Sequence, residues 1–208
     1  MTQGVELKGK RVLEVGCGRG GGSSFIARYL KPERITAADL SDEAVAFCRR
    51  THRIPCLDFE VGDAEHLPFA GAVFDAVVNV ESSHCYPNLS AFFKEVHRVL
   101  KPGGHFLYAD LHERSRLDEW RPSLNASGFK VICETDITRQ VLLALDRDNE
   151  RKVALINRFV PPFLRRSFFD FAGIRGSKIY ESFRSGTLVY ASFVAQKDGE
   201  PIQSSMKR

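Results

Sequence analysis

The feature that most constrains the fold is an apolar run that ends in an acid and opens at once into closely spaced glycines. Its sequence is RVLEVGCGRGGG, in which Glu14 is followed by Gly16, Gly18 and Gly20. The apolar run predicts a buried strand, and glycine at every second position predicts a tight loop whose backbone can approach a ligand closely. A helix is expected over residues 23–30, and its first N–H groups would point at that ligand.

Two classes of nucleotide ligand fit this loop. The pattern Gly16-x-Gly18-x-x-Gly21 satisfies the dinucleotide fingerprint, which is weakly specific when it stands alone. The order acidic-x-Gly-x-Gly-x-Gly, from Glu14 to Gly20, also fits the loop that binds S-adenosylmethionine. A glycine-rich turn between a strand and a helix that holds no ligand is the structural alternative.

A second acid supports a nucleoside ligand. The strand expected over residues 35–39 ends in Asp39, which lies 21 residues after Gly18. A carboxylate at that place can accept hydrogen bonds from both hydroxyls of a ribose. NAD and S-adenosylmethionine both carry a ribose, so Asp39 does not choose between them. Ser41 is better placed than Asp39 to cap the helix expected over residues 42–52.

The pattern of strand and helix continues in alternation as far as Asp110. This alternation predicts a parallel sheet with helices on both faces. The further strands are expected over residues 57–61, 74–80, 105–110, 129–135 and 187–196, and the further helices over residues 89–100 and 116–126.

A helical insertion is expected over residues 137–185, before the last strand. Apolar residues recur at helical spacing from Val141 to Val160, and Pro161-Pro162 interrupts the pattern. Four aromatic residues follow, namely Phe163, Phe168, Phe169 and Phe171. Two interpretations stay open: helical core packed against the sheet edge, or a lid that makes the apolar wall of a substrate pocket.

Taken in order, residues 10–112 resemble a class I S-adenosylmethionine-dependent methyltransferase. The matching residues are Glu14 to Gly20, Asp39, Gly62-Asp63-Ala64 before Leu67-Pro68-Phe69, Phe74-Asp75, and Val99 to Gly104. More narrowly, NVESSHCYP from Asn79 and YADL from Tyr108 are similar to mycobacterial phthiotriol and phenolphthiotriol dimycocerosate methyltransferases. The resemblance implies an α/β fold with a doubly wound, mostly parallel seven-stranded sheet, a Rossmann-like methyltransferase fold. Its last strand is antiparallel, and residues 1–208 form a single domain.

Ligands of open α/β sheets bind beyond the carboxyl ends of the strands, and the candidate site residues fall at such ends. The resemblance implies that S-adenosylmethionine is the cofactor and S-adenosylhomocysteine the product. The roles that it implies are these: the loop Gly16-Cys17-Gly18-x-Gly20 carries the methionine moiety, Glu14 lies under its ammonium group, Asp39 binds the ribose hydroxyls, Leu40 packs on adenine, Asp63 and the Ala64 amide bind the adenine ring, and the Asn79 carbonyl helps to hold the ammonium group.

A hydroxyl acceptor must lose its proton as the methyl group is transferred. His84 is the candidate general base, because imidazole side chains change protonation near neutral pH. Related sugar O-methyltransferases have a histidine and an aspartate where His84 and Asp110 stand. Asp110 would orient His84 or bind the hydroxyl. Glu81 is an alternative base, or a cation stabiliser if carbon were the acceptor, and a loop histidine satisfied by backbone is the structural alternative for His84.

The expected function is methyl transfer to a hydroxyl of a hydrophobic lipid or polyketide-like small molecule. Alternatives are a sterol-type C-methyltransferase and a cofactor-binding protein with little activity. The second arises because the resembled enzymes carry long N-terminal helices that close over the cofactor, whereas the first strand here begins near Lys10. An NAD-dependent oxidoreductase is disfavoured by Gly62-Asp63-Ala64. A nucleic-acid base methyltransferase is disfavoured because Val80-Glu81 follow Asn79 in place of a Pro-Pro-aromatic run.

Composition agrees with one globular domain. The chain has 208 residues, 43% hydrophobic content and a net charge of +4. No apolar run reaches the length of a signal core or membrane span, so a cytoplasmic protein is expected. Five cysteines without paired spacing predict reduced thiols and no metal. No nucleic-acid partner is expected. The basic residues of 147–166 predict a solvated face, with weak membrane-surface association and a homodimer left open.

Overall fold

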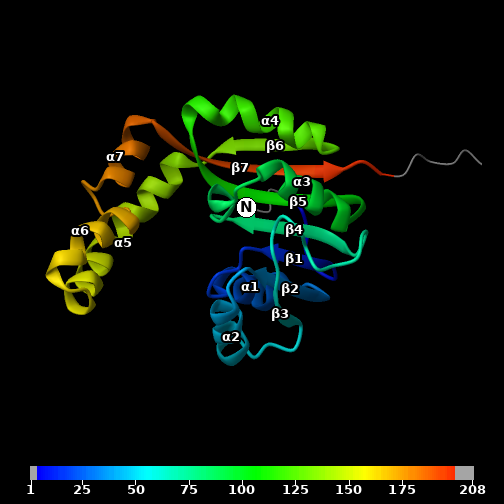
Figure 1. Cartoon of the computed structure of the whole chain (residues 1–208), viewed down its shortest axis with the longest axis horizontal. Coiled ribbons are helices and arrows are strands. Elements are labelled where there is room, and N and C mark those ends of the chain that lie inside the picture. The colour runs from blue at the N-terminus through cyan, green and yellow to red at the C-terminus, as the bar shows by residue number, and fades with distance from the viewer. Residues whose placement is uncertain (1–3, 200–208) are drawn as a thin grey trace, which may run out of the picture. The chain divides into compact units, whose positions relative to one another are not determined.

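The computed structural model describes residues 4–199, apart from the side chains of residues 118–120. Seven strands form one sheet in the order β3-β2-β1-β4-β5-β7-β6 (Figure 1). The strands are β1 (Arg11–Val15), β2 (Arg34–Asp39), β3 (Leu57–Val61), β4 (Phe74–Val80), β5 (Leu100–Glu113), β6 (Phe129–Asp136) and β7 (Leu188–Lys197). Four neighbouring pairs, from β3 to β5, are parallel, and Figure 1 draws β7 running opposite to β6. The predicted doubly wound, mostly parallel sheet is confirmed.

Helices connect the strands in the predicted alternation, except between β3 and β4, which no helix separates. They are α1 (Gly21–Phe25), η1 (Ile26–Leu30), α2 (Asp42–Thr51), η2 (Ser83–Cys85), α3 (Leu89–Val99), η3 (Arg114–Arg116), α4 (Leu117–Ala126), α5 (Thr138–Phe159), η4 (Pro162–Leu164), α6 (Arg165–Phe171) and α7 (Lys178–Ser185). Ser41 caps α2 as predicted, because its hydroxyl accepts a hydrogen bond of 3.1 Å from the Ala44 N–H. Asn88 caps α3 in the same way, with 3.0 Å to the Ala91 N–H.

The fold divides into two compact units. Among the described residues, the first unit comprises 4–110, 120–134 and 193–199, and the second comprises 111–119 and 135–192. The first unit contains every predicted site residue, and the second contains the predicted insertion. A single domain over the whole chain stays a prediction.

The core of the first unit is built on the central strands. Val12, Ile35, Ala76 and Leu107 are completely buried, as expected of a parallel sheet that is covered on both faces. A second group of aromatic rings, Phe92, Phe93, Phe106, Phe129 and Phe193, packs edge-on or tilted, with centroids 5.5–6.1 Å apart. This group fixes α3 against β5.

The strand order reverses between β1 and β4. The chain proceeds from β1 outward to β2 and β3, then returns so that β4 pairs with the other edge of β1. Glu14 consequently lies between Ala37 and Val78 in the register. A crevice at the carboxyl ends of the strands beside such a reversal is where open α/β sheets bind their ligands.

Two local predictions were wrong. The helix expected from Ser23 begins at Gly21, because Gly20 adopts a left-handed conformation with φ 73° that ends the loop earlier. The second half of that helix, η1, is a π-helical turn. The strand expected to begin at residue 105 begins at Leu100, so Lys101 to Gly104 lie inside β5, where its pairing with β4 shifts register. Lys101 is held there by a 2.8 Å ion pair with Asp75.

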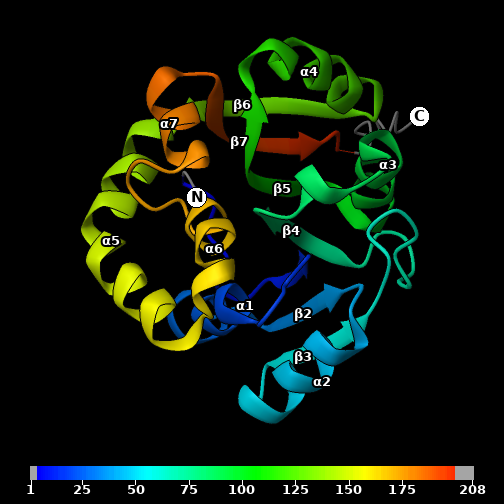
Figure 2. The same ribbon diagram turned by 60° about the vertical axis from the view of Figure 1, so that its left-hand side comes forward.

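The insertion forms three α-helices that pack against one another, α5, α6 and α7 (Figure 2). The predicted break at Pro161-Pro162 separates α5 from η4 and α6. Ile156 is buried, whereas Phe163, Phe168 and Phe171 are exposed. The interpretation of these three aromatics as helical core is therefore wrong. Across residues 4–199, no helix is long and apolar enough to cross a membrane.

Candidate active site

The glycine loop between β1 and α1 has a backbone that only glycine adopts readily. Gly16, Gly18 and Gly20 have φ angles of 74°, 53° and 73°. Space is a second constraint at Gly16, where a Cβ atom would overlap the side chains of Ser82 and Tyr86. The structure therefore requires glycine at Gly16 for both conformation and packing.

Cys17 lies in the same loop with its side chain buried. Burial raises the pKa of the Cys17 thiol, so the thiolate is disfavoured there. The Gly16 and Cys17 N–H groups both donate to the Ala38 carbonyl, at 2.8 and 3.0 Å. The loop is thereby tied to the end of β2.

Asp39 stands at the carboxyl end of β2 and touches the glycine loop directly. Its Oδ2 accepts a 2.7 Å hydrogen bond from the Gly18 N–H, and its Oδ1 accepts a 3.0 Å bond from the Ser41 N–H. Each carboxylate oxygen has capacity for a further donor. Asp39 thus orders the loop and still has acceptor sites for a ligand.

Glu14 is the last acid before the loop, and it is buried. The Ser23 hydroxyl, from the first turn of α1, donates to its carboxylate. Loss of hydration raises the pKa of Glu14 from its ordinary value of 4.5 to about 7, and the hydrogen bond from Ser23 opposes this shift only in part. A buried carboxyl group of this kind is stabilised as an anion by a cation placed beside it.

The segment after β3 reaches the same edge of the sheet. The Gly62 N–H donates to the Asp39 carbonyl at 2.9 Å. Asp63 is exposed and accepts a 2.9 Å bond from the Glu65 N–H, which lowers the pKa of Asp63. Ala64 is buried, whereas Leu40 is 73% exposed. The predicted adenine-binding residues therefore sit at adjacent strand ends.

Asn79, near the end of β4, is completely buried, and its side chain reaches the end of β1. Its Nδ2 donates to the Val15 carbonyl at 2.9 Å, and lies 2.8 Å from the Ser82 hydroxyl and 3.1 Å from the Tyr86 hydroxyl. Within the described part of the chain, its Oδ1 has no hydrogen-bond partner. Burial raises the pKa of Tyr86 to about 12, so the phenol stays protonated.

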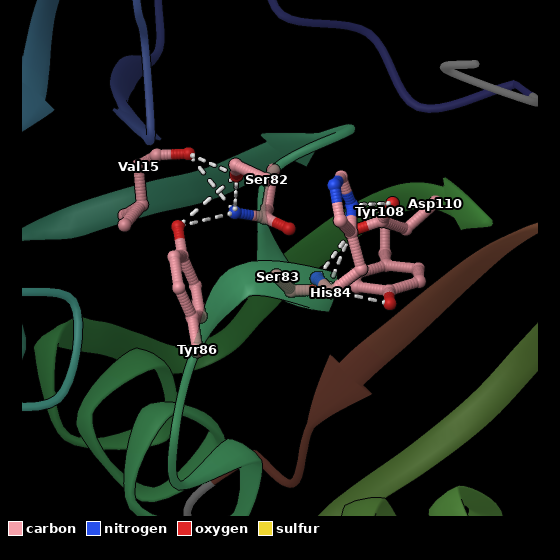
Figure 3. Close-up of polar contacts among 8 residues, drawn as sticks. Val15, Ser82, Ser83, His84, Tyr86, Tyr108 and Asp110 are labelled. Carbon is pink, nitrogen blue, oxygen red and sulfur yellow. Dashed lines mark hydrogen bonds and ion pairs between the residues drawn. The ribbon is translucent and has the colours of Figure 1, made fainter. Parts of the chain in front are cut away.

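His84 and Asp110 come from the two separate short motifs, NVESSHCYP and YADL, and their side chains are in contact. The ring Nδ1 of His84 lies 2.7 Å from Oδ1 of Asp110, and the His84 backbone N–H donates to Oδ2 at 3.1 Å (Figure 3). Asp110 is 0% exposed, while the His84 side chain is 33% exposed. A buried carboxylate thus fixes the ring of a histidine that reaches the surface, and Nε2 is the nitrogen turned to other partners.

Ser83 and Tyr108 form a chain of hydrogen bonds to Asp110, and the sequence analysis assigned no role to either residue. The Ser83 hydroxyl donates to Asp110 Oδ2 at 2.7 Å and lies 2.7 Å from the Tyr108 hydroxyl. Because Ser83 has a single hydroxyl hydrogen, Tyr108 is the donor between these two. The Tyr108 ring stacks on Phe193 with centroids 4.3 Å apart. Ser82, Ser83, Tyr86 and Tyr108 all lie in the two short motifs, which was the only signal for them.

Glu81 is exposed and has a left-handed backbone with φ 54°, which is rare outside glycine. Its N–H donates to the Ala109 carbonyl at 2.9 Å, so the turn follows directly from the end of the β4–β5 pairing. After this turn, Ser82 contacts Asn79 of β4 and Ser83 contacts Asp110 of β5. The structure pairs His84 with Asp110 and leaves Glu81 as the strained residue that precedes them.

Two surface hollows lie elsewhere. One is lined by Arg49 and Glu60 beside β3. The other is lined by Asp75, near the start of β4, and by Lys101 of β5. Neither contains a predicted site residue. In residues 4–199, no group of three or more His, Cys, Asp or Glu side chains is arranged to hold a metal.

Comparison with known proteins identifies the family. A methyltransferase domain family matches residues 13–108. A phthiotriol/phenolphthiotriol dimycocerosates methyltransferase from Mycobacterium tuberculosis is 41% identical over 194 residues, which are 93% of this chain and 72% of that protein. A fatty-acid O-methyltransferase from Mycolicibacterium smegmatis is 40% identical over 196 residues, covering 94% of this chain and 71% of that protein.

A solved structure has the same fold. It is phosphoethanolamine N-methyltransferase 2 from Haemonchus contortus in complex with S-adenosyl-L-methionine, with a TM-score of 0.75 at 23% identity, covering 94% of this chain and 50% of that chain. The predicted family, fold and enzyme class are confirmed. The glycine loop, the acids at the strand ends and these relatives together place the chain among the class I S-adenosylmethionine-dependent methyltransferases, in the family of the mycobacterial phthiotriol/phenolphthiotriol dimycocerosates methyltransferases.

Proposed function

We propose that this enzyme methylates a hydroxyl group of a hydrophobic lipid or polyketide-like small molecule, with His84 as the general base. The observation that carries the proposal is the contact between the His84 ring and the buried carboxylate of Asp110, at 2.7 Å. A carboxylate in this position selects the tautomer with hydrogen on Nδ1 and leaves Nε2 able to accept a proton. It also stabilises the imidazolium that forms.

The residues around the glycine loop suit S-adenosylmethionine. Glu14 is a buried carboxyl group that lacks a cationic partner among its hydrogen-bond donors, which suits an ammonium group beyond the loop. Asn79 has a buried side-chain oxygen without a donor in the described structure. We assign Gly16, Cys17, Gly18 and Gly20 to the methionine moiety, Asp39 to the ribose, and Leu40, Asp63 and Ala64 to adenine.

When bound, the cofactor supplies a methyl group on a positively charged sulfur, which is already activated toward displacement. Attack by the acceptor oxygen on that methyl carbon would break the carbon–sulfur bond and leave the bonding electrons on sulfur. His84 Nε2 takes the hydroxyl proton. Asp110 holds the ring in place throughout, and the protein mostly contributes position and exclusion of water.

The acceptor class rests on two supports. The relatives are named for dimycocerosates and for fatty acids. The second support is the insertion, residues 137–185, whose helix α5 carries the half-buried apolar residues Val141, Leu142 and Leu145, and we propose that this part acts as a lid over the acyl chain. The acceptor supplies a hydroxyl oxygen and an apolar body.

The test is methyl transfer to a hydroxylated lipid, followed by mass spectrometry of the product. His84→Gln should lower the rate about 10²–10⁴-fold, because no base then takes the proton from the acceptor hydroxyl. Cofactor affinity, measured by calorimetry, should stay unchanged. His105→Gln is the matched control, since His105 lies on the same strand five positions before Asp110.

Two results would contradict the proposal. A His84→Gln enzyme that turns over like the wild type would remove His84 from the mechanism and leave Glu81 or no base. Methyl incorporation at carbon, read from the fragmentation of the product, would replace O-methylation with the sterol-like alternative.

A further inference from the structure

One end of the helical insertion is covered with exposed aromatic and aliphatic side chains. Phe171 is 90% exposed, Phe163 82% and Phe159 68%. We call this surface the aromatic tip; its residues are Leu155, Phe159, Phe163, Leu164, Phe168 and Phe171. Large apolar side chains gathered on one surface mark a binding site more often than scattered ones do.

The aromatic tip is continuous along the chain and spans two packed helices. Leu155 and Phe159 lie one turn apart on α5. Leu164, the N-cap of α6, and Phe168 and Phe171 on α6 recur at the i, i+4, i+7 spacing of one helix face. Phe163 lies in the η4 turn that joins the two helices. Helices α5 and α6 lie side by side, drawn in yellow-green and yellow in Figure 2.

Most of the charge on the same stretch has one sign. Residues 151–169 contain no Asp or Glu, and Asp170 is the one acid among the residues of α6. Residues 151–169 contain five cations, namely Arg151, Lys152, Arg158, Arg165 and Arg166, of which Arg151 is ion-paired with Asp148 at 2.6 Å. The surface around the aromatic tip therefore attracts anions.

Three of these cations lie beside the aromatic side chains. The Arg158 guanidinium is 5.1 Å from the centre of the Phe159 ring. Arg165 donates to the Val160 and Asn157 carbonyls, at 3.0 and 2.8 Å, so it closes the end of α5 and keeps its charge. Arg166 is exposed on the first turn of α6. Long basic side chains next to apolar ones can bury their stems while their charges stay in a polar layer.

We infer that the aromatic tip is a docking surface for an anionic lipid bilayer. Aromatic and aliphatic side chains enter the boundary between headgroups and acyl chains, while arginines meet the phosphates. A second copy of this chain is a poorer occupant, because a symmetric contact would bring Arg158, Arg165 and Arg166 of one copy against the same three arginines of the other. The inference concerns the surface alone and does not depend on which residue is the base.

The experiment is co-sedimentation of the whole protein with vesicles, without cofactor or acceptor. One set of vesicles is phosphatidylcholine, and the other is phosphatidylcholine mixed with phosphatidylglycerol. The protein should bind the anionic set about tenfold more tightly or better, since each basic side chain near such a surface contributes about a fivefold factor. Added salt should weaken the binding by screening.

Two paired variants separate the two contributions. Phe163→Ser with Phe171→Ser should remove most binding to both vesicle types. Arg158→Gln with Arg166→Gln should abolish most of the preference for the anionic set. The matched controls are Tyr29→Ser, an exposed aromatic on η1 in the other unit, and Arg50→Gln, an exposed cation on α2. Both controls should bind like the wild type, and circular dichroism checks that all variants are folded.

Equal affinity for neutral and anionic vesicles, or equal losses in the controls, would overturn the inference. So would a wild-type protein that ignores vesicles but forms a dimer that the Phe163→Ser, Phe171→Ser variant dissolves, as seen by sedimentation velocity. His84→Gln should bind vesicles like the wild type. A failure of the proposed chemistry is thereby distinguished from a failure of the docking surface.

Discussion

At the residue scale, the carboxylate of Asp110 decides how His84 is presented. Its two oxygens accept from the His84 ring, the His84 backbone and the Ser83 hydroxyl. A buried carboxylate needs such donors to stay ionised, and each donor also limits its rotation. Tyr108, through Ser83, extends the same chain of hydrogen bonds into the core.

If His84 and Asp110 act as one unit, their substitutions should not be additive. Asp110→Asn should slow methyl transfer about 10²–10⁴-fold, because an amide neither selects the tautomer nor stabilises the imidazolium. The double variant His84→Gln, Asp110→Asn should be no slower than the slower single variant. Single-turnover rates of the four proteins measure this coupling. Factors that multiply would mean that the two residues act independently.

Glu14 should make the stability of the cofactor-free protein depend on pH. The pKa of Glu14 is raised from its ordinary value of 4.5, which applies to the unfolded chain, to about 7 in the folded protein. Between those values the folded chain holds a proton that the unfolded chain releases, so stability falls as pH rises from about 5 to about 7 and is level above. Glu14→Gln removes this titration and should be more stable than the wild type at pH 8 by about 1–3 kcal/mol.

Urea unfolding of both proteins at about pH 5 and pH 8 checks this sign. The difference between the two proteins should be small at the lower pH, where Glu14 is neutral in the fold. A wild type that gains stability relative to Glu14→Gln as pH rises would show that Glu14 is ionised and partnered without cofactor.

At the scale of elements, the short segment from Ser82 to Tyr86 joins the two halves of the site. Ser82 and Tyr86 face Asn79 and the glycine loop, while Ser83 and His84 face Asp110 (Figure 3). The left-handed turn at Glu81 starts this arrangement. We therefore expect the conformation of the glycine loop to affect the position of the candidate base.

Gly16→Ala tests that coupling. A Cβ atom there would overlap Ser82 and Tyr86, and the left-handed backbone adds strain, so we expect a loss of about 1–3 kcal/mol in the free energy of unfolding. Cofactor affinity and methyl-transfer rate should fall together. Gly21→Ala is the control, because no atom lies within 4 Å of a Cβ at that position and its φ is not positive.

The control should match the wild type or gain up to about 1 kcal/mol. Denaturant unfolding and calorimetry with S-adenosylhomocysteine give both quantities. A Gly16→Ala protein as stable and as active as Gly21→Ala would show that the loop and the segment from Ser82 to Tyr86 do not constrain each other.

At the scale of the whole molecule, the proposed cofactor and acceptor functions belong to different parts of the chain. The first unit holds the glycine loop, the acids at the strand ends and the His84–Asp110 pair. The second unit holds the helical insertion that we propose as the lid. Under this proposal, the sheet would keep its cofactor chemistry while the insertion determines which acceptor is used.

Acceptor chain length should therefore control activity. In a homologous series of hydroxylated lipids, kept below their aggregation limit, affinity should improve by up to about 0.8 kcal/mol, roughly fourfold, for each methylene that is buried. Initial rates at low substrate concentration report the trend. Activity that is independent of chain length, or highest on a polar sugar, would rule out the lipid acceptor.

Much of this protein is determined by local sequence pattern alone. The glycine spacing from Gly16 to Gly20 dictates left-handed loop residues, and apolar runs of strand length, alternating with helices, dictate a parallel sheet. Ser41 was predicted as a cap for the same reason, since capping depends on residues three positions apart. The strand-end acids follow from these local signals without knowledge of their neighbours.

Tertiary structure alone decided which of these side chains meet. Ser82 contacts the end of β1 and its neighbour Ser83 contacts β5, which depends on a strained turn at Glu81 that no propensity predicts. The ring of Tyr108 stacks on Phe193, which lies 85 positions later in the chain, so the local sequence does not reveal this contact. The sequence could not predict that Phe163 and Phe171 are exposed, because helical periodicity shows which residues share a face but not what covers that face.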